Sequence, residues 1–212
     1  KMGRLVEEMA VARHHTVAGH IDAGDDTWPA ADVAIDFSTA DSVIANAPAL
    51  ARRGLNLVIG TTGWSAHEPA LRQVVAEAGV GIVVAPNFST GVVLFEAIVA
   101  QAARLFAPQE EFGAFLHEAH HAAKKDAPSG TAILIKRTME ESGFPRPIDV
   151  SSTRAGFIPG THHVGFDGPA ETVTLSHAAR DRTAFARGAL TAAKWIHGKQ
   201  GWYTMKDVLG IT

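Results

Sequence analysis

The residues best suited to chemistry gather in one stretch, HEAHHAAKKDAPSGT at 117–131, which holds three histidines, two lysines and a helix-start signal. His117, Glu118 and His121 also spell H-E-x-x-H, the pattern with which a helix presents two zinc ligands and a general base. Two kinds of chemistry are therefore open to this stretch. It could hold a metal ion, or it could bind carboxylates and move protons.

The zinc alternative requires His117 and His121 to lie one helical turn apart, with a third ligand downstream. His162 and His163 are the candidates for that third ligand. The preceding residues, EFGAFLHEA, have the character of a strand, and a strand holds side chains four positions apart too far from each other. We therefore expect no metal and keep a zinc hydrolase using His117 and His121 only as an alternative.

The segment DAPSGTA at 126–132 predicts the start of a helix. Asp126 and Pro128 would end the preceding segment, and Ser129 would cap the helix. The backbone N–H groups of Gly130 and Thr131 would then lie unpaired at the positive end of the helix, where carboxylate or phosphate binds. Gly130 would let such a ligand approach closely.

Cations and proton donors stand just before this helix start. Lys124 or Lys125 would add a full positive charge, and His120 or His121 would add a group that can give a proton near neutral pH. A carboxylate clamp beside a proton donor is a coherent site, and it accounts for why these residues occur together.

The elements that position this site follow two different patterns. In the first 88 residues, short apolar runs alternate with helical patterns, which predicts a Rossmann-like, doubly wound parallel sheet with helices on both faces. The expected strands are at 15–22, 32–37, 55–60 and 80–86, and the expected helices at 3–13, 39–54 and 65–79.

Beyond residue 108 the pattern predicts an α+β domain, an open mixed or antiparallel sheet with one helix at 129–142. Its expected strands are at 111–119, 149–156, 161–166 and 171–179. The tail at 183–198 is helical and should pack back on the first domain. We therefore expect a dinucleotide-binding domain at 1–88 and 183–212, and a domain for substrate binding and oligomerisation at 89–182.

Three expected strand ends could hold a ligand, because doubly wound sheets bind ligands at the carboxyl ends of their strands. They are GTTGW at 60–64, APNFSTG at 85–91, and Asp22, which would bond the ribose of NAD. Ala23 stands where an arginine would accommodate a 2′-phosphate, so NADH is slightly favoured over NADPH. The sequence opens on KMG, without a first strand and G-x-G-x-x-G loop, and we expect it to start inside that glycine loop.

Composition excludes several classes of function. The net charge of −3 favours neither a nucleic-acid nor a membrane-surface partner, and the lack of cysteine removes disulfides and thiolate chemistry. The most apolar segment, 91–107, is short and carries Glu96 and Arg104, so we expect a buried helix rather than a membrane span. No secretory signal is visible, and we expect a soluble cytoplasmic protein.

The signature E-A-H-H-x-x-K-x-D-A-P-S-G-T-A at 118–132 resembles that of the 4-hydroxy-tetrahydrodipicolinate reductase (dihydrodipicolinate reductase) family. The similarity extends to IDFS, GTTGW, APNFSTGV, RAGFIPGTHHVGF, SHAARDRTAFARGALTAAKWI and MKDVLG, in order along nearly the whole chain. The resemblance implies NAD(P)H-dependent reduction of a small dicarboxylate, 4-hydroxy-tetrahydrodipicolinate, in lysine and diaminopimelate biosynthesis. It also implies a homotetramer joined through the second domain.

The resemblance also implies roles for individual residues. His120 and Lys124 would be catalytic. Substrate would be bound by His121, Gly130, Thr131 and Arg182. The cofactor would be bound by Lys1, Met2, Asp22, Gly60, Thr61, Thr62, Ala85, Pro86, Asn87 and Phe88. A non-catalytic remnant that cannot bind the dinucleotide remains a second alternative.

Overall fold

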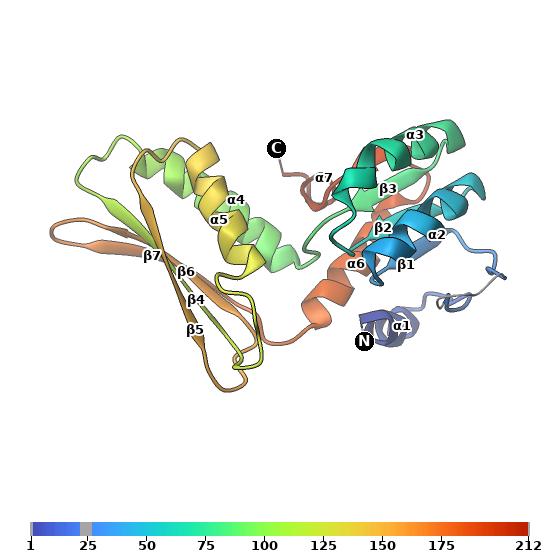
Figure 1. Cartoon of the computed structure of the whole chain (residues 1–212), viewed down its shortest axis with the longest axis horizontal. Coiled ribbons are helices and arrows are strands. Elements are labelled where there is room, and N and C mark those ends of the chain that lie inside the picture. The colour runs from blue at the N-terminus through green and yellow to red at the C-terminus, as the bar shows by residue number, and fades with distance from the viewer. Residues whose placement is uncertain (1, 22–26, 212) are drawn as a thin grey trace. The chain divides into compact units, whose positions relative to one another are not determined.

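The structure, a computed structural model, describes residues 2–21 and 27–211 and divides into two compact units (Figure 1). The first unit runs to Thr90 and takes up the chain again at Thr183, while the second spans Gly91–Arg182. Each unit has its own sheet and its own hydrophobic core.

The first unit is built on a fully parallel sheet in the order β1-β2-β3-β8. Its strands are β1 (Val33–Asp36), β2 (Asn56–Ile59), β3 (Gly81–Val84) and β8 (Gly201–Tyr203). Its helices are α1 (Met2–Ala12), α2 (Ala40–Arg52), α3 (Glu68–Ala78), α6 (Thr183–Ile196) and α7 (Met205–Leu209). A short 3-10 turn, η1 (Ser65–His67), precedes α3.

Helices cover both faces of this sheet. One face packs against α2 and α3 in a core that includes Leu57, Ile59 and Ile82. On the other face α1 and α6 pack together, and Ile35 of β1 lies against them. The arrangement is the doubly wound parallel sheet that the alternating pattern predicts, and the runs of β2 and β3 are apolar because both of their faces are buried.

The prediction of a strand at 15–22 is wrong for its described part. Residues 15–21 form no strand, and most of them are exposed. Only Val17 and Ile21 pack against the cores, Val17 against the cluster of α1 and α6 and Ile21 against the cluster that includes α2 and α3. An extended segment is stable in a sheet only when a neighbour pairs with its backbone, and no described strand does so here. The edge strand β8, by contrast, has no counterpart in the prediction.

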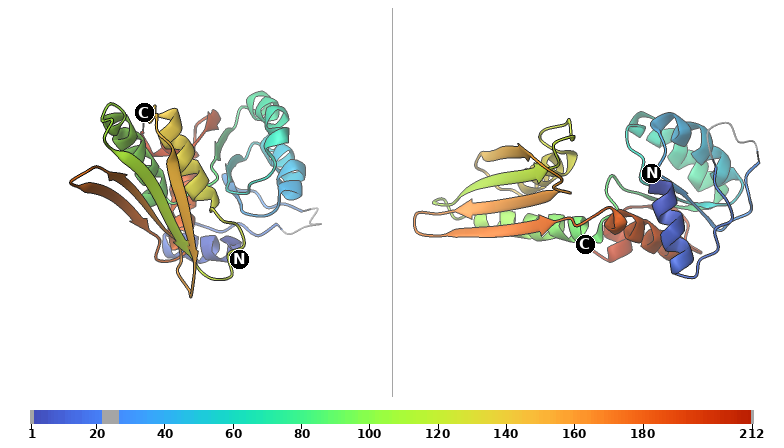
Figure 2. Two further views of the ribbon diagram at one scale, coloured as in Figure 1. Left: turned by 60° about the vertical axis from the view of Figure 1, so that its left-hand side comes forward. Right: turned by 90° about the horizontal axis from the view of Figure 1, so that it is seen from below.

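The second unit is a mixed sheet in the order β5-β4-β6-β7, with two helices on one face (Figure 2). β4 (Gly113–His120) runs parallel to β5 (Ile148–Arg154) and antiparallel to β6 (Thr161–Asp167), which is antiparallel to β7 (Thr172–Ala178). The helices are α4 (Thr90–Phe106) and α5 (Gly130–Glu141). Their inner faces form one core with Ala114 and Leu116 of β4, Ile148 of β5, and Val164 and Phe166 of β6.

The expectation of a buried helix at 91–107 is only half right. α4 buries Phe95, Val99 and Ala103 against the sheet, but Leu94 and Ile98 on its outer face are 43% and 54% exposed. The difference follows from the two-layer build of the unit, which leaves the outer face of a helix uncovered. No helix in the described ranges is long and apolar enough to cross a membrane.

Candidate active site

Strand β4 carries the centre of the candidate site. Glu118 and His120 are two positions apart, so they project from the same face of the strand as the core residue Leu116. Register supplies their neighbours from the adjacent strands. His162 of β6 lies opposite Glu118, and Arg154 of β5 lies opposite His120.

Glu118 is fully buried, and both of its carboxylate oxygens accept hydrogen bonds. Arg154 donates from Nη1 to Oε2 at 3.0 Å and from Nη2 to Oε1 at 2.7 Å. The backbone N–H of Ser129 donates to Oε1 at 3.3 Å, and Nδ1 of His120 hydrogen bonds with Oε2. Burial alone would raise the pKa of Glu118, but the hydrogen bonds from Arg154, Ser152 and His120 outweigh it and lower the pKa to about 2. A carboxylate anion is therefore fixed inside the unit.

The His120 ring is held on both sides. Its Nδ1 faces Glu118, and its Nε2 lies so close to Gly160 that a Cβ on that glycine would approach to 3.0 Å. Burial lowers the pKa of His120, while the neighbouring Glu118 works against that shift. Its imidazolium form is therefore a readier proton donor than an ordinary histidine.

His162 lies beneath His120, with ring centroids 5.3 Å apart in an edge-to-face arrangement. Its side chain is buried, and Nε2 hydrogen bonds with the hydroxyl of Ser129 at 3.2 Å. Burial first, and then the charge on protonated His120, lowers the pKa of His162 to about 4. His162 is therefore a neutral supporting group at physiological pH.

The start of α5 has the expected cap. The Ser129 hydroxyl accepts from the N–H of Ala132 at 3.2 Å, and its carbonyl accepts from Ile133 at 3.0 Å. The N–H groups of Gly130 and Thr131 have no partner among the residues that the structure describes. A Cβ on Gly130 would meet nothing within 4 Å, so the space beside these donors is open to a ligand.

Lys124 supplies the cation next to this helix start. Its Nζ donates to Asp126 Oδ1 at 2.7 Å, and this hydrogen bond lowers the pKa of Asp126. The Asp126 carbonyl in turn accepts from Arg154 Nη2 at 2.6 Å. The loop between β4 and α5 is thus tied to the same guanidinium that holds Glu118.

The H-E-x-x-H geometry does not form. His117 lies within β4, where it hydrogen bonds with Ser151 at 3.0 Å, and His121 follows the end of the strand. A different trio, Glu118, His120 and His162, brings possible ligand atoms within 4.8 Å of one another. However, Arg154 occupies both oxygens of Glu118, and its positive charge opposes a cation there. The trio suits proton handling better than metal binding.

In the first unit, an open hollow of about 260 Å³ lies at the carboxyl ends of β1 and β2. It is lined by Met2, Phe37, Ser38, Thr39, Gly60, Thr61 and Thr62. This is the edge at which doubly wound sheets bind dinucleotides, and the hydroxyls and backbone groups there match a phosphate or ribose. The residues present therefore fit a dinucleotide cofactor.

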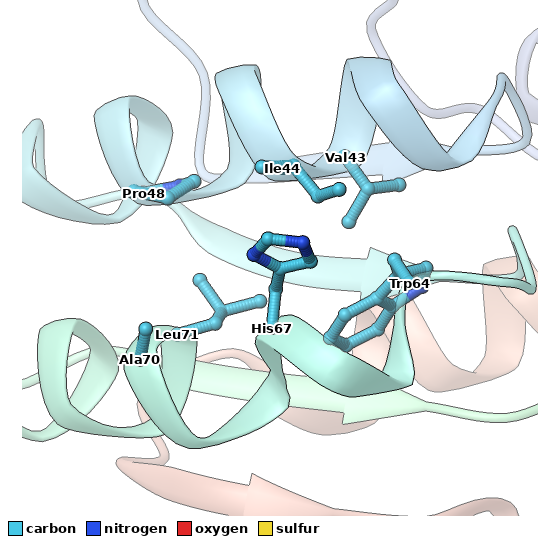
Figure 3. Close-up of a pocket in the computed structure, with 7 residues that line it drawn as sticks. All are labelled: Val43, Ile44, Pro48, Trp64, His67, Ala70 and Leu71. Carbon is cyan, nitrogen blue, oxygen red and sulfur yellow. The ribbon is translucent and has the colours of Figure 1, made fainter.

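Local contacts shape the rim of this hollow. The Thr61 hydroxyl donates to Asp36 at 2.6 Å and accepts from the N–H of Ser38 at 2.8 Å, which joins the loops after β1 and β2. A Cβ on Gly60 would lie 2.1 Å from the Phe37 ring, so only glycine fits there. A smaller apolar pocket between α2 and α3 has His67 as its polar group and offers no comparable set of donors (Figure 3).

The remaining predicted residues belong to the loop after β3 and to four single positions along the chain. In the loop after β3, Ala85 and Phe88 are buried, and Phe88 packs edge-on against Phe37, so this loop can offer a ligand mainly its backbone and Asn87. Lys1 and Asp22 lie outside the described residues. His121 is half-buried just after β4. Arg182 is exposed in the turn before α6, and no interaction joins it to the site within the described ranges.

Sequence reasoning missed a role for Glu118, Arg154 and His162 in one network. Side chains two positions apart in a strand lie on the same face, and this was a sufficient signal for placing Glu118 beside His120. The partners from β5 and β6 depend on strand register, which no local pattern fixes. In the first unit, Ser38 and Thr39 were not among the predicted cofactor residues, although both line the hollow.

Comparisons with known proteins agree over both units. Residues 1–88 match the family model described as dihydrodipicolinate reductase, N-terminus, and residues 91–209 match dihydrodipicolinate reductase, C-terminus. The 4-hydroxy-tetrahydrodipicolinate reductase of Methanosarcina barkeri is 40% identical over 197 residues, which cover 85% of this chain and 74% of that protein. The reductase of the same name from Myxococcus xanthus is 41% identical over 200 residues, covering 85% and 73%.

A solved structure has the same fold. The dipicolinate-bound dihydrodipicolinate reductase from Paenisporosarcina sp. TG-14 superposes with a TM-score of 0.79 at 23% identity, covering 96% of this chain and 93% of that one. At this identity the likeness shows the fold.

Proposed function

The chain belongs to the dihydrodipicolinate reductase family, and from this premise we propose how its residues carry out the family's reaction, the NAD(P)H-dependent reduction of 4-hydroxy-tetrahydrodipicolinate in lysine biosynthesis. The observation that carries the function is the match of both units to this one family, with identities near 40% to reductases of this name.

The reaction consumes one proton. Loss of water from the substrate leaves a conjugated imine, a hydride adds to it, and a proton must be supplied for the product. The nicotinamide cofactor, when bound, supplies the hydride. In our proposal His120 supplies the proton from Nε2, since its Nδ1 is held by Glu118.

The substrate is a dicarboxylate, and the start of α5 is its proposed binding site. One carboxylate would accept hydrogen bonds from the N–H groups of Gly130 and Thr131 and pair with Lys124, which would exchange its contact with Asp126 for one with the ligand. The approach of this carboxylate would raise the pKa of His120 and so favour the protonated acid when substrate is bound. We assign the second carboxylate to His121 and Arg182 on the resemblance alone.

The cofactor is proposed to lie against the hollow lined by Met2, Gly60, Thr61 and Thr62, with the backbone of 85–88 completing the site. Lys1 and Asp22 remain assignments made from the resemblance. We expect a slight preference for NADH, or weak discrimination between the two cofactors, because Ala23 follows Asp22. Initial rates with saturating NADH and NADPH test this, and a strong preference for NADPH would contradict it.

A homotetramer through the second unit is the proposed assembly. The sheet face that α4 and α5 leave uncovered presents Phe115, 38% exposed, which lies over Gly165 so closely that no side chain fits between them. Light scattering coupled to size exclusion would give the mass. A monomer at micromolar concentration would refute the assembly.

The experiment that tests the site follows substrate-dependent NADH oxidation with enzymatically generated substrate. His120→Gln and Lys124→Ala should each lower kcat by about 10²-fold or more while the fold is retained. Unchanged kcat in both variants would refute the assigned roles. No turnover by the parent protein, together with no binding of NADH, would favour the non-catalytic remnant instead.

A further inference from the structure

We propose that Glu118 is a positioning residue that acts through His120: it keeps the proton on Nδ1, leaves Nε2 as the only nitrogen that can exchange a proton, and ties the ring to the start of α5. The proposal rests on the proposed role of His120 as the acid. It goes further by assigning that acid's tautomer and orientation to a carboxylate with no contact to the reacting atoms.

Hydrogen bonds join three elements to the Glu118 carboxylate, and a fourth element lies beside it. Within β4 it meets His120, from β5 it receives both terminal nitrogens of Arg154, and from the cap of α5 it receives the N–H of Ser129. Its cross-strand neighbour in β6 is His162. The Ser129 N–H directly precedes the two N–H groups assigned to the substrate carboxylate. Glu118 therefore fixes the distance between the acid and the anion site.

Hydrogen-bond chemistry sets the tautomer. An ionised carboxylate only accepts, so the His120 nitrogen facing it must carry a hydrogen in both the neutral and the charged ring. All proton exchange then occurs at Nε2, beside Gly160. In Glu118→Gln, Arg154 would hold the amide oxygen and turn the NH₂ group toward Nδ1. That arrangement demands a bare Nδ1 and disfavours the imidazolium.

The charges that face His120 come from every element around it. Glu118 favours the charged ring, whereas Arg154 of β5 and Lys124 of the β4–α5 loop oppose it. His162 of β6 lies against the ring, and His177 of β7 lies beyond His162 with ring centroids 6.5 Å apart. Among these groups Glu118 is the single anion, so its removal should make the imidazolium less stable. As the pH is raised, activity would then begin to fall at a lower pH than it does in the parent protein.

A double-mutant cycle on the intact protein separates positioning from a general structural role. Glu118→Gln should lower kcat by about 10²-fold in the parent, with a smaller change in KM, and should shift the descending limb of kcat/KM by about one pH unit or more toward acid. In the His120→Gln background the same change should alter kcat by less than about threefold, since the group it acts through is already gone. An equal loss in both backgrounds would overturn the proposal.

Two controls keep the outcomes distinct. Glu96→Gln replaces the carboxyl group of another buried glutamate in the same unit, which accepts from Thr138 at 3.2 Å, and should leave the pH profile in place. Glu118→Asp should recover part of the activity because it keeps the anion. If His120→Gln alone is as active as the parent, the assignment of the acid fails, and this result is independent of Glu118.

The tautomer can be read without any variant of Glu118. In ¹⁵N NMR of the parent protein, with the His120 signals assigned by their loss in His120→Gln, the neutral ring should be protonated at Nδ1. Protonation at Nε2 would overturn the proposal even if Glu118→Gln did not fold.

Discussion

Replacing His162 with glutamine should remove much of the acid sensitivity of the second unit. The imidazole is 4% exposed, and its surroundings lower the pKa from 6.5 to about 4. Because the pKa of His162 is lower in the folded state, its contribution to stability is fully present above pH 6.5 and is lost as the pH falls toward 4. Glutamine keeps a polar group near Ser129 but takes up no proton.

The size of the effect follows from linkage between protonation and unfolding. For an unfolded pKa of 6.5 and a folded pKa of about 4, lowering the pH from about 7.5 to about 5 costs about 2 kcal/mol of unfolding free energy. The difference in this loss between the parent and His162→Gln isolates the contribution of His162 from those of other titrating groups.

The assay must report on the second unit alone. Intrinsic fluorescence cannot do so, because all four tryptophans, Trp28, Trp64, Trp195 and Trp202, belong to the first unit. Hydrogen exchange of the β4 and β6 amides, corrected for intrinsic rates at each pH, measures the opening free energy of the relevant sheet. An identical pH dependence in the parent and in His162→Gln would refute the reasoning. The same substitution at exposed His197 serves as the control.

Two further predictions concern the first unit. Gly188→Ala should destabilise it by more than about 3 kcal/mol, because the added Cβ would lie 1.6 Å from the Phe88 carbonyl oxygen and α6 would have to move. Tryptophan fluorescence in urea measures the free energy of unfolding, and a change under about 1 kcal/mol would contradict this prediction. Thr61→Val should raise the KM for NADH by about tenfold with kcat little changed, because it breaks the hydroxyl contacts with Asp36 and Ser38 that shape the cofactor hollow. An unchanged KM for NADH would count against that site.

The sequence predicted those parts of the fold that local patterns determine. β2 and β3 were evident because a strand buried on both faces is continuously apolar. The cap at Ser129 was evident because serine is among the preferred N-cap residues, and Pro128 ends the segment before it. The strand expected at 15–22 failed for the opposite reason. Its apolar residues are real, but strand formation depends on a pairing neighbour that the local pattern does not specify.

The candidate site likewise has one part that the local sequence predicts and another that it does not. His120, Lys124, Gly130 and Thr131 lie close in sequence, so composition and a resemblance were enough to propose them. The hydrogen bonds from Arg154 to Glu118 join residues 36 positions apart and arise from the register of β4 against β5. Such a contact is a property of the assembled sheet, and reading the chain locally could not reveal it.

The start of α5 and Lys124 are proposed to bind the dicarboxylate beside His120. The most direct test is a titration with pyridine-2,6-dicarboxylate, a planar dicarboxylate, followed through backbone amide NMR shifts. The Gly130 and Thr131 amides should move together and saturate with one affinity, and Lys124→Ala should weaken that affinity by about tenfold or more. Inhibition of turnover by the same compound, with these two amides unmoved, would contradict the claim.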